Sequence, residues 1–128
     1  MINIWYPVKP KPAPRPRVTK FGTYNNTDYT QWKNGLSMLA KSRFKKPLEG
    51  NIYLKIDFFF EIPKSWSKAK KDNAGWHNLK PDIDNLIKSV MDAFNGIVYK
   101  DDGQVVLIQA RKQYATCNGV KIEIEEII

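Results

Sequence analysis

The sequence predicts one domain of mixed α+β class, in which helices pack on a small mixed sheet that ends in a C-terminal antiparallel hairpin. Three observations predict this class. Residues 51–63 (NIYLKIDFFFEIP) place apolar side chains on one face of a strand, and residues 83–94 repeat apolar residues at helical spacing. Asn118-Gly119 separates two further strand-like segments, as in a hairpin. With 128 residues, 42% of them hydrophobic, the chain is long enough to bury one core.

The remaining elements follow from local patterns. Residues 2–8 (INIWYPV) are rich in aromatic and β-branched residues and predict a first strand. Residues 28–44 predict a helix, capped by Asp28 and buried through Trp32, Leu36, Leu39, Ala40 and Phe44. Residues 104–115 and 120–127 predict the last two strands.

The segment 83–94 predicts an amphipathic helix. Its apolar residues recur at i, i+3, i+4, i+7, i+8 and i+11, and they are Ile83, Leu86, Ile87, Val90, Met91 and Phe94. Pro81 favours a helix that starts just after it, so we expect Asp82 as N-cap, with Asn85 contributing to a partial capping box. Asp84 then lies in the first turn, and Lys88 follows four residues later on the same face.

The positive charge is concentrated in the first 80 residues. The chain carries a formal net charge of +8, and residues 1–80 alone hold sixteen Lys and Arg against five Asp and Glu. A basic body of this kind attracts polyanions, of which nucleic acid is the commonest in a cell. Two basic segments are either solvated connections (a charged linker and an insertion) or DNA contacts, and we predict DNA contacts. They are a proline-rich arm (9–20), with Arg15, Arg17 and Lys20, and a flexible loop (64–80), with Lys68, Lys70, Lys71 and Lys80.

Composition also bears on location. No run of eighteen apolar residues exists, so we expect no membrane span. The N-terminus places its short apolar stretch before its charges, which is the wrong order for a secretory signal. A single cysteine, Cys117, excludes an intramolecular disulfide, and a cytoplasmic location is expected.

Carboxylates gather in one part of this basic chain. Five of the thirteen acidic residues fall between Asp82 and Asp102. Taken singly, Asp82 and Asp84 suit a helix start, and Asp101-Asp102-Gly103 suits a turn. Taken together, Asp82, Asp84, Asp101 and Asp102 are the donors of a divalent-cation site, because Mg²⁺ prefers carboxylates, water and phosphate oxygens. Such an ion activates water against a phosphodiester, and a nearby Lys88 neutralises transition-state charge.

The sequence lacks the residues that zinc sites and nucleotide-binding loops require. The chain has one histidine, His77, and no pair of closely spaced cysteines, so it has no multi-histidine or cysteine zinc site. It has no GxxxxGK[ST] loop for nucleotide binding.

With these residues assembled, the chain resembles the RusA family of Holliday-junction resolvases, small Mg²⁺-dependent endonucleases common in prophages. The resemblance rests on KPDIDNLIKSVMDAFNG and VYKDDGQVV, with PRPRVT and SWSKAKK as further similar segments. It implies a homodimer that binds four-way DNA junctions in recombination and repair and nicks two opposed strands symmetrically. It also implies that Asp82, Asp84 and Asp102 are catalytic metal ligands, with Lys88 as the catalytic cation and Asp101 as a neighbouring ligand. Mg²⁺ is the implied cofactor, and Mn²⁺ is expected to substitute for it.

Two other hypotheses are compatible with the same residues. In the first, the protein binds nucleic acid without catalysis, and its aspartates are only helix caps and turns. In the second, the basic half binds an acidic protein partner and no nucleic acid. Metal-dependent cleavage of branched DNA separates the nuclease hypothesis from both.

Overall fold

The computed structural model describes residues 1–14, 17–19, 22–24 and 27–128. The predicted α+β class is confirmed, since these residues form a mixed sheet with helices. In chain order the elements are β1 (Ile2–Tyr6), β2 (Arg17–Thr19), β3 (Gly22–Tyr24), α1 (Thr27–Arg43), β4 (Asn51–Glu61), α2 (Lys68–Asp72), α3 (Ile83–Phe94), the 3₁₀ turn η1 (Asp102–Gln104), β5 (Val105–Ala115) and β6 (Gly119–Ile127).

The main sheet has four strands in the order β1-β6-β4-β5. β4 lies inside it, paired in parallel with β5 and antiparallel with β6, so that Ile56 is opposite both Ala110 and Ile122. A parallel pair cannot be joined by a tight turn. The chain therefore crosses from β4 to β5 through α2 and α3.

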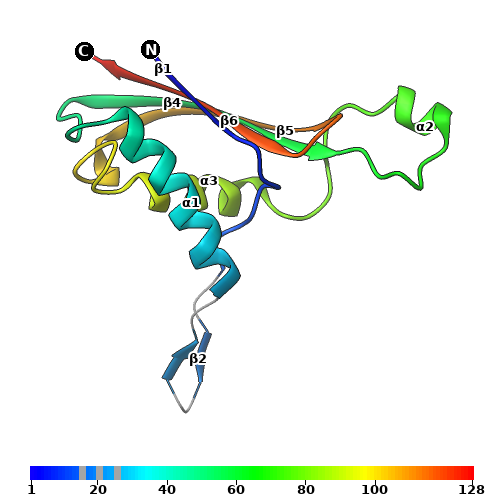
Figure 1. Ribbon diagram of the computed structural model, residues 1–128, viewed down its shortest axis with the longest axis horizontal. Helices are drawn as coiled ribbons and strands as arrows, with labels where there is room; N and C mark the ends of the chain where they lie inside the picture. Colours follow the sequence, from blue (N-terminus) through cyan, green and yellow to red (C-terminus); the bar gives the residue numbers. More distant parts are fainter. Residues whose placement is uncertain (15–16, 20–21, 25–26) are drawn as a thin grey trace.

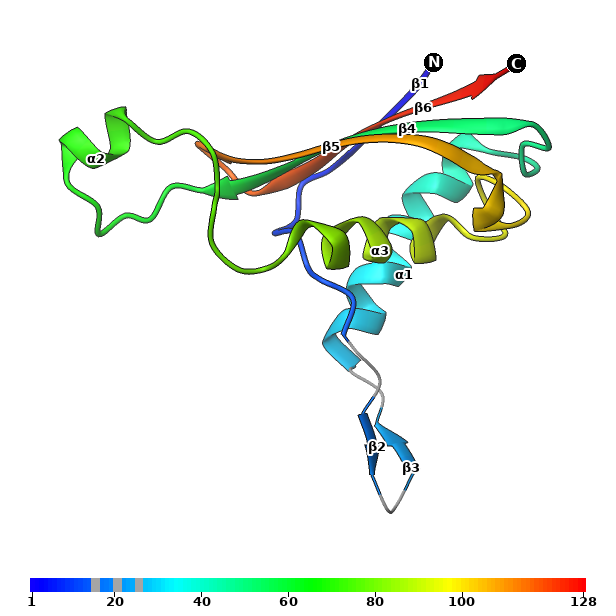
Figure 2. The same ribbon diagram turned by 180° about the vertical axis from the view of Figure 1, so that it is seen from behind.

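The long helices α1 and α3 lie on the same side of the sheet, as both views of the ribbon show (Figures 1 and 2). The core fills the space between them and the sheet. On β4 every second side chain from Ile52 to Phe60 is buried there, because strand side chains alternate between faces, and this confirms the predicted face. No helix in the described ranges is both long enough and apolar enough to cross a membrane.

The buried face of α3 is rotated slightly from the predicted stripe. Leu86, Val90 and Phe94 are buried as expected, but Ile83 is 37% exposed. Ser89 and Ala93 are buried as well. The small residues let α3 approach its neighbours, and the Ala93 carbonyl accepts a hydrogen bond from the Ser37 hydroxyl of α1 at 2.7 Å.

The predicted C-terminal hairpin is only partly correct. β5 and β6 run antiparallel to each other and are joined through Asn118-Gly119, but β4 lies between them, so they are not hydrogen-bonded partners. The connecting turn passes over the end of β4 and binds it there. The Glu61 amide donates to the Asn118 side-chain oxygen at 2.8 Å, and the Ile62 amide donates to the Ala115 carbonyl at 3.0 Å.

The proline-rich arm is not irregular throughout. Its first part packs on the helices, because the Trp32 indole donates to the Lys9 carbonyl and the Ala13 amide donates to the Asn85 carbonyl of α3. Further along, β2 and β3 pair as a small antiparallel ribbon, for which Val18 and Thr19 supply β-branched residues.

The basic segment 64–80 contains the predicted short helix, α2, which begins after the N-cap Ser67. Figure 1 shows α2 at the end of a long excursion from the sheet. Both sides of the excursion are held by aromatic contacts, since Trp66 packs edge-on against Tyr114 and His77 stacks on Phe60 with ring centroids 3.9 Å apart.

The buried His77 predicts a pH-dependent stability. Burial lowers the pKa of His77 below its ordinary value, and the charges of Lys112 and Lys9 lower it further. The unfolded chain therefore takes up a proton below about pH 6.5 that the folded chain resists. We expect the free energy of unfolding, measured by urea denaturation, to fall between pH 7.5 and pH 5.5.

In His77→Phe, which keeps the stacking on Phe60, this decrease should be smaller. An equal decrease in both proteins would assign the pH dependence to other groups.

Candidate active site

The start of α3 lies at the carboxyl end of the parallel strand pair, which is where α/β crossovers commonly form ligand sites. Asp82 occupies the N-cap position of α3, and its backbone is extended (φ −70°, ψ 144°). Its side chain makes no capping hydrogen bond, so the predicted capping box is not formed. Both oxygens of Asp82 instead accept from Lys80 Nζ, at 2.7 and 2.9 Å.

A groove of about 860 Å³ runs along this end of α3 beside β5. It contains Asp82 and Asp84, the first two predicted metal ligands, together with three cationic residues. Its lining is Trp76, His77, Asn78, Leu79, Lys80, Asp82, Ile83, Asp84, Ala110, Arg111 and Lys112. The structure therefore brings the first carboxylate pair into one open, mixed-charge groove.

The carboxylates are accessible to a ligand. The Lys80–Asp82 ion pair is exposed, with side-chain accessibilities of 84% and 50%. Exposed pairs of this kind contribute at most about 1 kcal/mol, because water screens them. Asp84 Oδ1 accepts the neighbouring Asn85 amide at 2.9 Å and is exposed. Exchanging Lys80 for another cation at Asp82 would therefore cost little.

Lys112 of β5 holds the segment that leads into α3. Its Nζ donates to the carbonyls of Leu79 and Pro81, each at 2.6 Å. Burial lowers the pKa of Lys112; the charge of Asp82 opposes this effect and that of Lys80 adds to it. Lys112 thus fixes the backbone on which Lys80 and Asp82 are carried.

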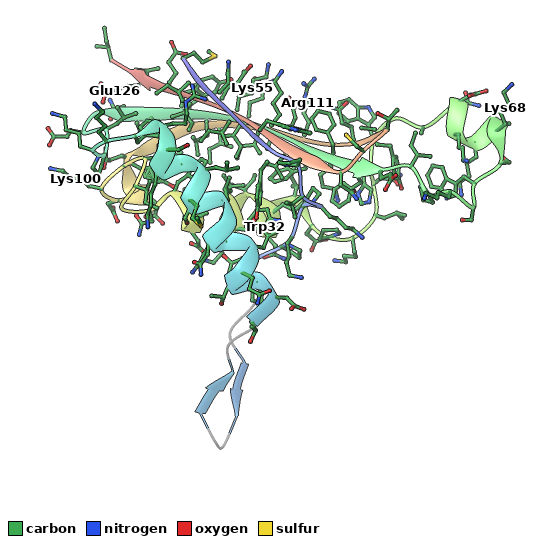
Figure 3. The ribbon with its side chains drawn as sticks, in the orientation of Figure 1. Trp32, Lys55, Lys68, Lys100, Arg111 and Glu126 are labelled. Atoms are coloured by element: carbon green, nitrogen blue, oxygen red, sulfur yellow. The ribbon has the colours of Figure 1, made fainter. Side chains whose placement is uncertain are left out.

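Arg111 brings a second cation of β5 to the groove. Its Nε donates to Oδ1 of the buried Asp57 on β4 at 2.7 Å, which raises the pKa of the guanidinium. Figure 3 shows Arg111 on the side of the sheet away from α1. Lys112, the next residue, instead faces the segment 79–81. The side chains of Arg111 and Lys112 therefore lie on opposite faces of the edge strand β5.

Lys88, which shares a helix face with Asp84, forms its ion pair with Asp92 instead. Lys88 Nζ lies 3.3 Å from Asp92 Oδ2, one turn further along α3. The same oxygen accepts the Tyr29 hydroxyl at 3.0 Å. Burial raises the pKa of Tyr29, and the hydrogen bond to Asp92 raises it further. Lys88 is exposed and lies between two carboxylates of one helix face.

The second pair of predicted ligands begins beyond the other end of α3, a helix about 18 Å long at 1.5 Å per residue. Asp101 accepts the Gly103 amide at 3.1 Å and forms a capping box with Gln104, so it holds the turn η1. Burial raises the pKa of Tyr99, and the charges of Asp102, Asp92 and Asp101 raise it further. Asp102 and Asp92 are therefore both close enough to Tyr99 for their charges to act on its hydroxyl.

Within residues 1–14, 17–19, 22–24 and 27–128, no three His, Cys, Asp or Glu side chains form a group able to hold a metal ion. The four predicted carboxylates thus occupy two places, one pair in the groove and one pair near Tyr99. The complete ligand set stays a prediction.

The predicted DNA contacts are described only in part. Lys68, Lys70 and Lys71 are exposed on α2, and Figure 3 shows Lys68 at the far end of the excursion. Lys70 Nζ also lies 4.3 Å from the Trp66 ring centroid. Arg15 and Lys20 lie outside the described residues, and Arg17 is described only through its backbone in β2.

Comparison with known proteins gives the family. The family model described as "Endodeoxyribonuclease RusA" matches residues 7–125, which is nearly the whole chain. The chain belongs to the RusA endodeoxyribonuclease family. This confirms the resemblance seen in the sequence and places the protein among nucleases.

Two relatives agree with this assignment. The Bacillus subtilis (strain 168) "Uncharacterized protein YqaN" is 37% identical over 86 residues, which are 62% of this chain and 61% of that protein. The "Crossover junction endodeoxyribonuclease rusA" of Lactococcus phage r1t is 35% identical over 94 residues, 71% of this chain and 68% of that protein. The alignments thus span about two thirds of each relative's own length.

Of the residues that line the groove in this RusA-family chain, only Lys80, Asp82 and Asp84 are predicted site residues, and those that sequence reasoning missed include Trp76, Arg111 and Lys112. In the sequence, Trp76 only follows a basic stretch. No local sequence pattern identifies Lys112 as a site residue, because its partners Leu79 and Pro81 are 33 and 31 residues away in sequence. For Asp92, the spacing of four residues from Lys88 is the one local pattern that indicates its ion pair.

Lys112→Met should slow DNA cleavage more than it weakens DNA binding. Without the ammonium group, the Leu79 and Pro81 carbonyls lose their common donor and the position of Asp82 loosens. Small displacements at a reacting centre are costly, so we expect the single-turnover cleavage rate to fall by about tenfold or more.

Lys121→Met, which removes an exposed lysine from β6, is the matched control. A wild-type cleavage rate in Lys112→Met would mean that this lysine does not position the site.

Proposed function

We propose that this RusA-family protein is a Mg²⁺-dependent endonuclease that resolves four-way DNA junctions by nicking two opposed strands. The observation that carries the proposal is the groove, in which Asp82 and Asp84 lie among cationic side chains at the start of α3. Phosphodiester cleavage needs a cation bound by acidic groups, and it needs positive charge to hold the phosphate. The family, and the name of the phage relative, support the same reaction.

The donor set fits magnesium. Mg²⁺ in phosphate-processing sites takes one or two protein carboxylates and completes its shell with water and phosphate oxygens. Asp82 and Asp84 supply such a pair. Asp101 and Asp102 stay proposed ligands, although in this structure they lie beyond the other end of α3. When bound, the ion would polarise a phosphoryl oxygen and acidify a water molecule. Mn²⁺ accepts the same oxygen donors and is expected to substitute.

The side chains around the carboxylates have proposed roles of their own. Lys80 neutralises Asp82 in the free protein and would be available to contact a phosphate if Asp82 held a divalent cation instead. Lys88 carries the charge that opposes the negative charge developing on the phosphoryl group. The Lys112 hydrogen bonds hold the segment 79–81, so that this exchange occurs on a fixed backbone.

The basic segments are proposed to bind the arms of the junction. The lysines of α2 are exposed on an excursion from the sheet, which suits a contact with phosphates at a distance from the cleaved bond (Figure 2). Arg15, Arg17 and Lys20 are proposed to do the same from the proline-rich arm. DNA as substrate agrees with the predicted cytoplasmic location.

Replacing Asp82 tests the nuclease. Asp82→Asn should abolish junction cleavage in Mg²⁺, because an amide binds the cation poorly. It should preserve or tighten junction binding, because one negative charge near the phosphates is removed. The measurements are gel-resolved nicking of a labelled four-way junction and its dissociation constant in Ca²⁺, whose looser coordination supports binding without cleavage.

The matched control is Glu125→Gln, which removes one exposed carboxylate from β6. If Asp82→Asn cleaves normally, the protein binds DNA without using this site, as the non-catalytic hypothesis holds.

The α2 lysines should determine part of the salt dependence. Lys70→Gln combined with Lys71→Gln should weaken junction binding and make the log–log salt dependence shallower by about 0.9 for each phosphate that is no longer neutralised. Lys45→Gln with Lys46→Gln, an exposed pair after α1, is the control. Identical slopes for the two double variants would exclude α2 from the DNA interface.

Symmetric nicking requires two equivalent sites, and we propose a homodimer for this reason. The mass of the free protein in sedimentation equilibrium should be close to twice 14.9 kDa. A monomer both alone and on the junction would contradict paired nicking by one assembly.

A further inference from the structure

Exposed apolar side chains gather at one edge of the groove that holds the carboxylates. Trp76 is 67% exposed, Leu79 61% and Ile83 37%, and all three line the groove. A well-packed domain seldom leaves several large apolar groups together in water unless they contact a ligand. The cluster is not explained by folding, since the core closes without it.

Trp76 is fixed by its backbone. It forms an isolated antiparallel bridge with Gln113 of β5, flanked by hydrogen bonds from the Tyr114 amide to the Gly75 carbonyl at 2.8 Å and from the His77 amide to the Lys112 carbonyl at 3.1 Å. Because side chains alternate along an extended segment, burial of His77 turns Trp76 outward. The indole is thus presented to solvent from a rigid edge.

The charges beside this edge indicate the kind of ligand. Lys80, Arg111 and Lys112 line the same groove as the indole, and so do the two carboxylates. An aromatic platform next to cationic groups suits a nucleotide, whose base stacks and whose phosphate is neutralised.

We propose that Trp76 and Leu79 form a nucleobase subsite, which receives an unstacked base next to the phosphodiester held at Asp82 and Asp84. The inference rests on the proposed function and deepens it. A continuous duplex stacks each base between two neighbours, whereas stacking is interrupted where strands exchange at a branch point, so a base there leaves the stack at a lower cost in free energy. Selection of branched DNA would then come partly from this aromatic surface, in addition to the phosphate contacts.

Binding measured without cleavage tests the subsite. Wild type and Trp76→Ala are titrated in Ca²⁺ against a four-way junction, a single-stranded oligonucleotide and a continuous duplex. Stacking on one aromatic side chain predicts a decrease in affinity of about 5- to 150-fold for the junction and the single strand. Affinity for the duplex should stay the same.

Two variants keep the test specific. Trp76→Phe retains an aromatic face and should restore most of the affinity for the junction and the single strand. Met38→Ala removes a side chain of α1 that is 69% exposed and should change nothing. Circular dichroism of each variant confirms that it is folded.

Unchanged junction affinity in Trp76→Ala would overturn the proposal and would favour a protein segment as the occupant of the apolar edge. An equal decrease for duplex and junction, or no recovery with Phe, would also overturn it. Failure of the proposed function gives a different result, namely a wild-type protein that does not nick junctions in Mg²⁺. The binding comparison in Ca²⁺ is independent of that result.

Discussion

The parallel pairing of β4 with β5 is the constraint from which the candidate site follows. Parallel neighbours require a crossover, and here that crossover is the segment 62–104, which carries α2, α3 and η1. The crossover brings the start of α3 to the carboxyl end of the strand pair, where Lys112 binds its leading segment. A hairpin between these strands would have left no room for Asp82 and Asp84 at this edge.

The groove holds carboxylates and cationic side chains next to one another. A carboxylate pair alone repels a phosphodiester, and cations alone hold it without chemistry. The exposed Lys80–Asp82 pair combines both in a form that is easily separated, because water screens its attraction. The chain can therefore be strongly basic overall and still keep an acidic pair at its candidate active site.

Much of the fold could be predicted because the decisive patterns are local. Each of these patterns predicts the structure of the segment that contains it. They are the alternation along residues 52–60, the helical spacing of apolar residues from Leu86 to Phe94, and the basic composition of residues 64–80. Strand order was not predictable in this way, because Asn118-Gly119 signals a reversal of the chain but not which strand lies between its two arms. The roles of Lys112 and Trp76 also depend on residues distant in sequence, so only the assembled sheet reveals them.

The proposed DNA contacts and the proposed metal ligands lie on different elements of this fold. The proposed metal ligands Asp82 and Asp84 lie at the start of α3, which packs against the core, whereas the exposed lysines lie on α2, outside the main body. Trp76 stands between these parts, on a segment bound to the edge of β5. We therefore expect changes in α2 to alter how DNA is held without moving the carboxylates, and changes in the leading segment 79–81 to alter the position of the carboxylates directly. This separation is the physical reason to expect that DNA affinity in Ca²⁺ and DNA cleavage in Mg²⁺ depend on different residues.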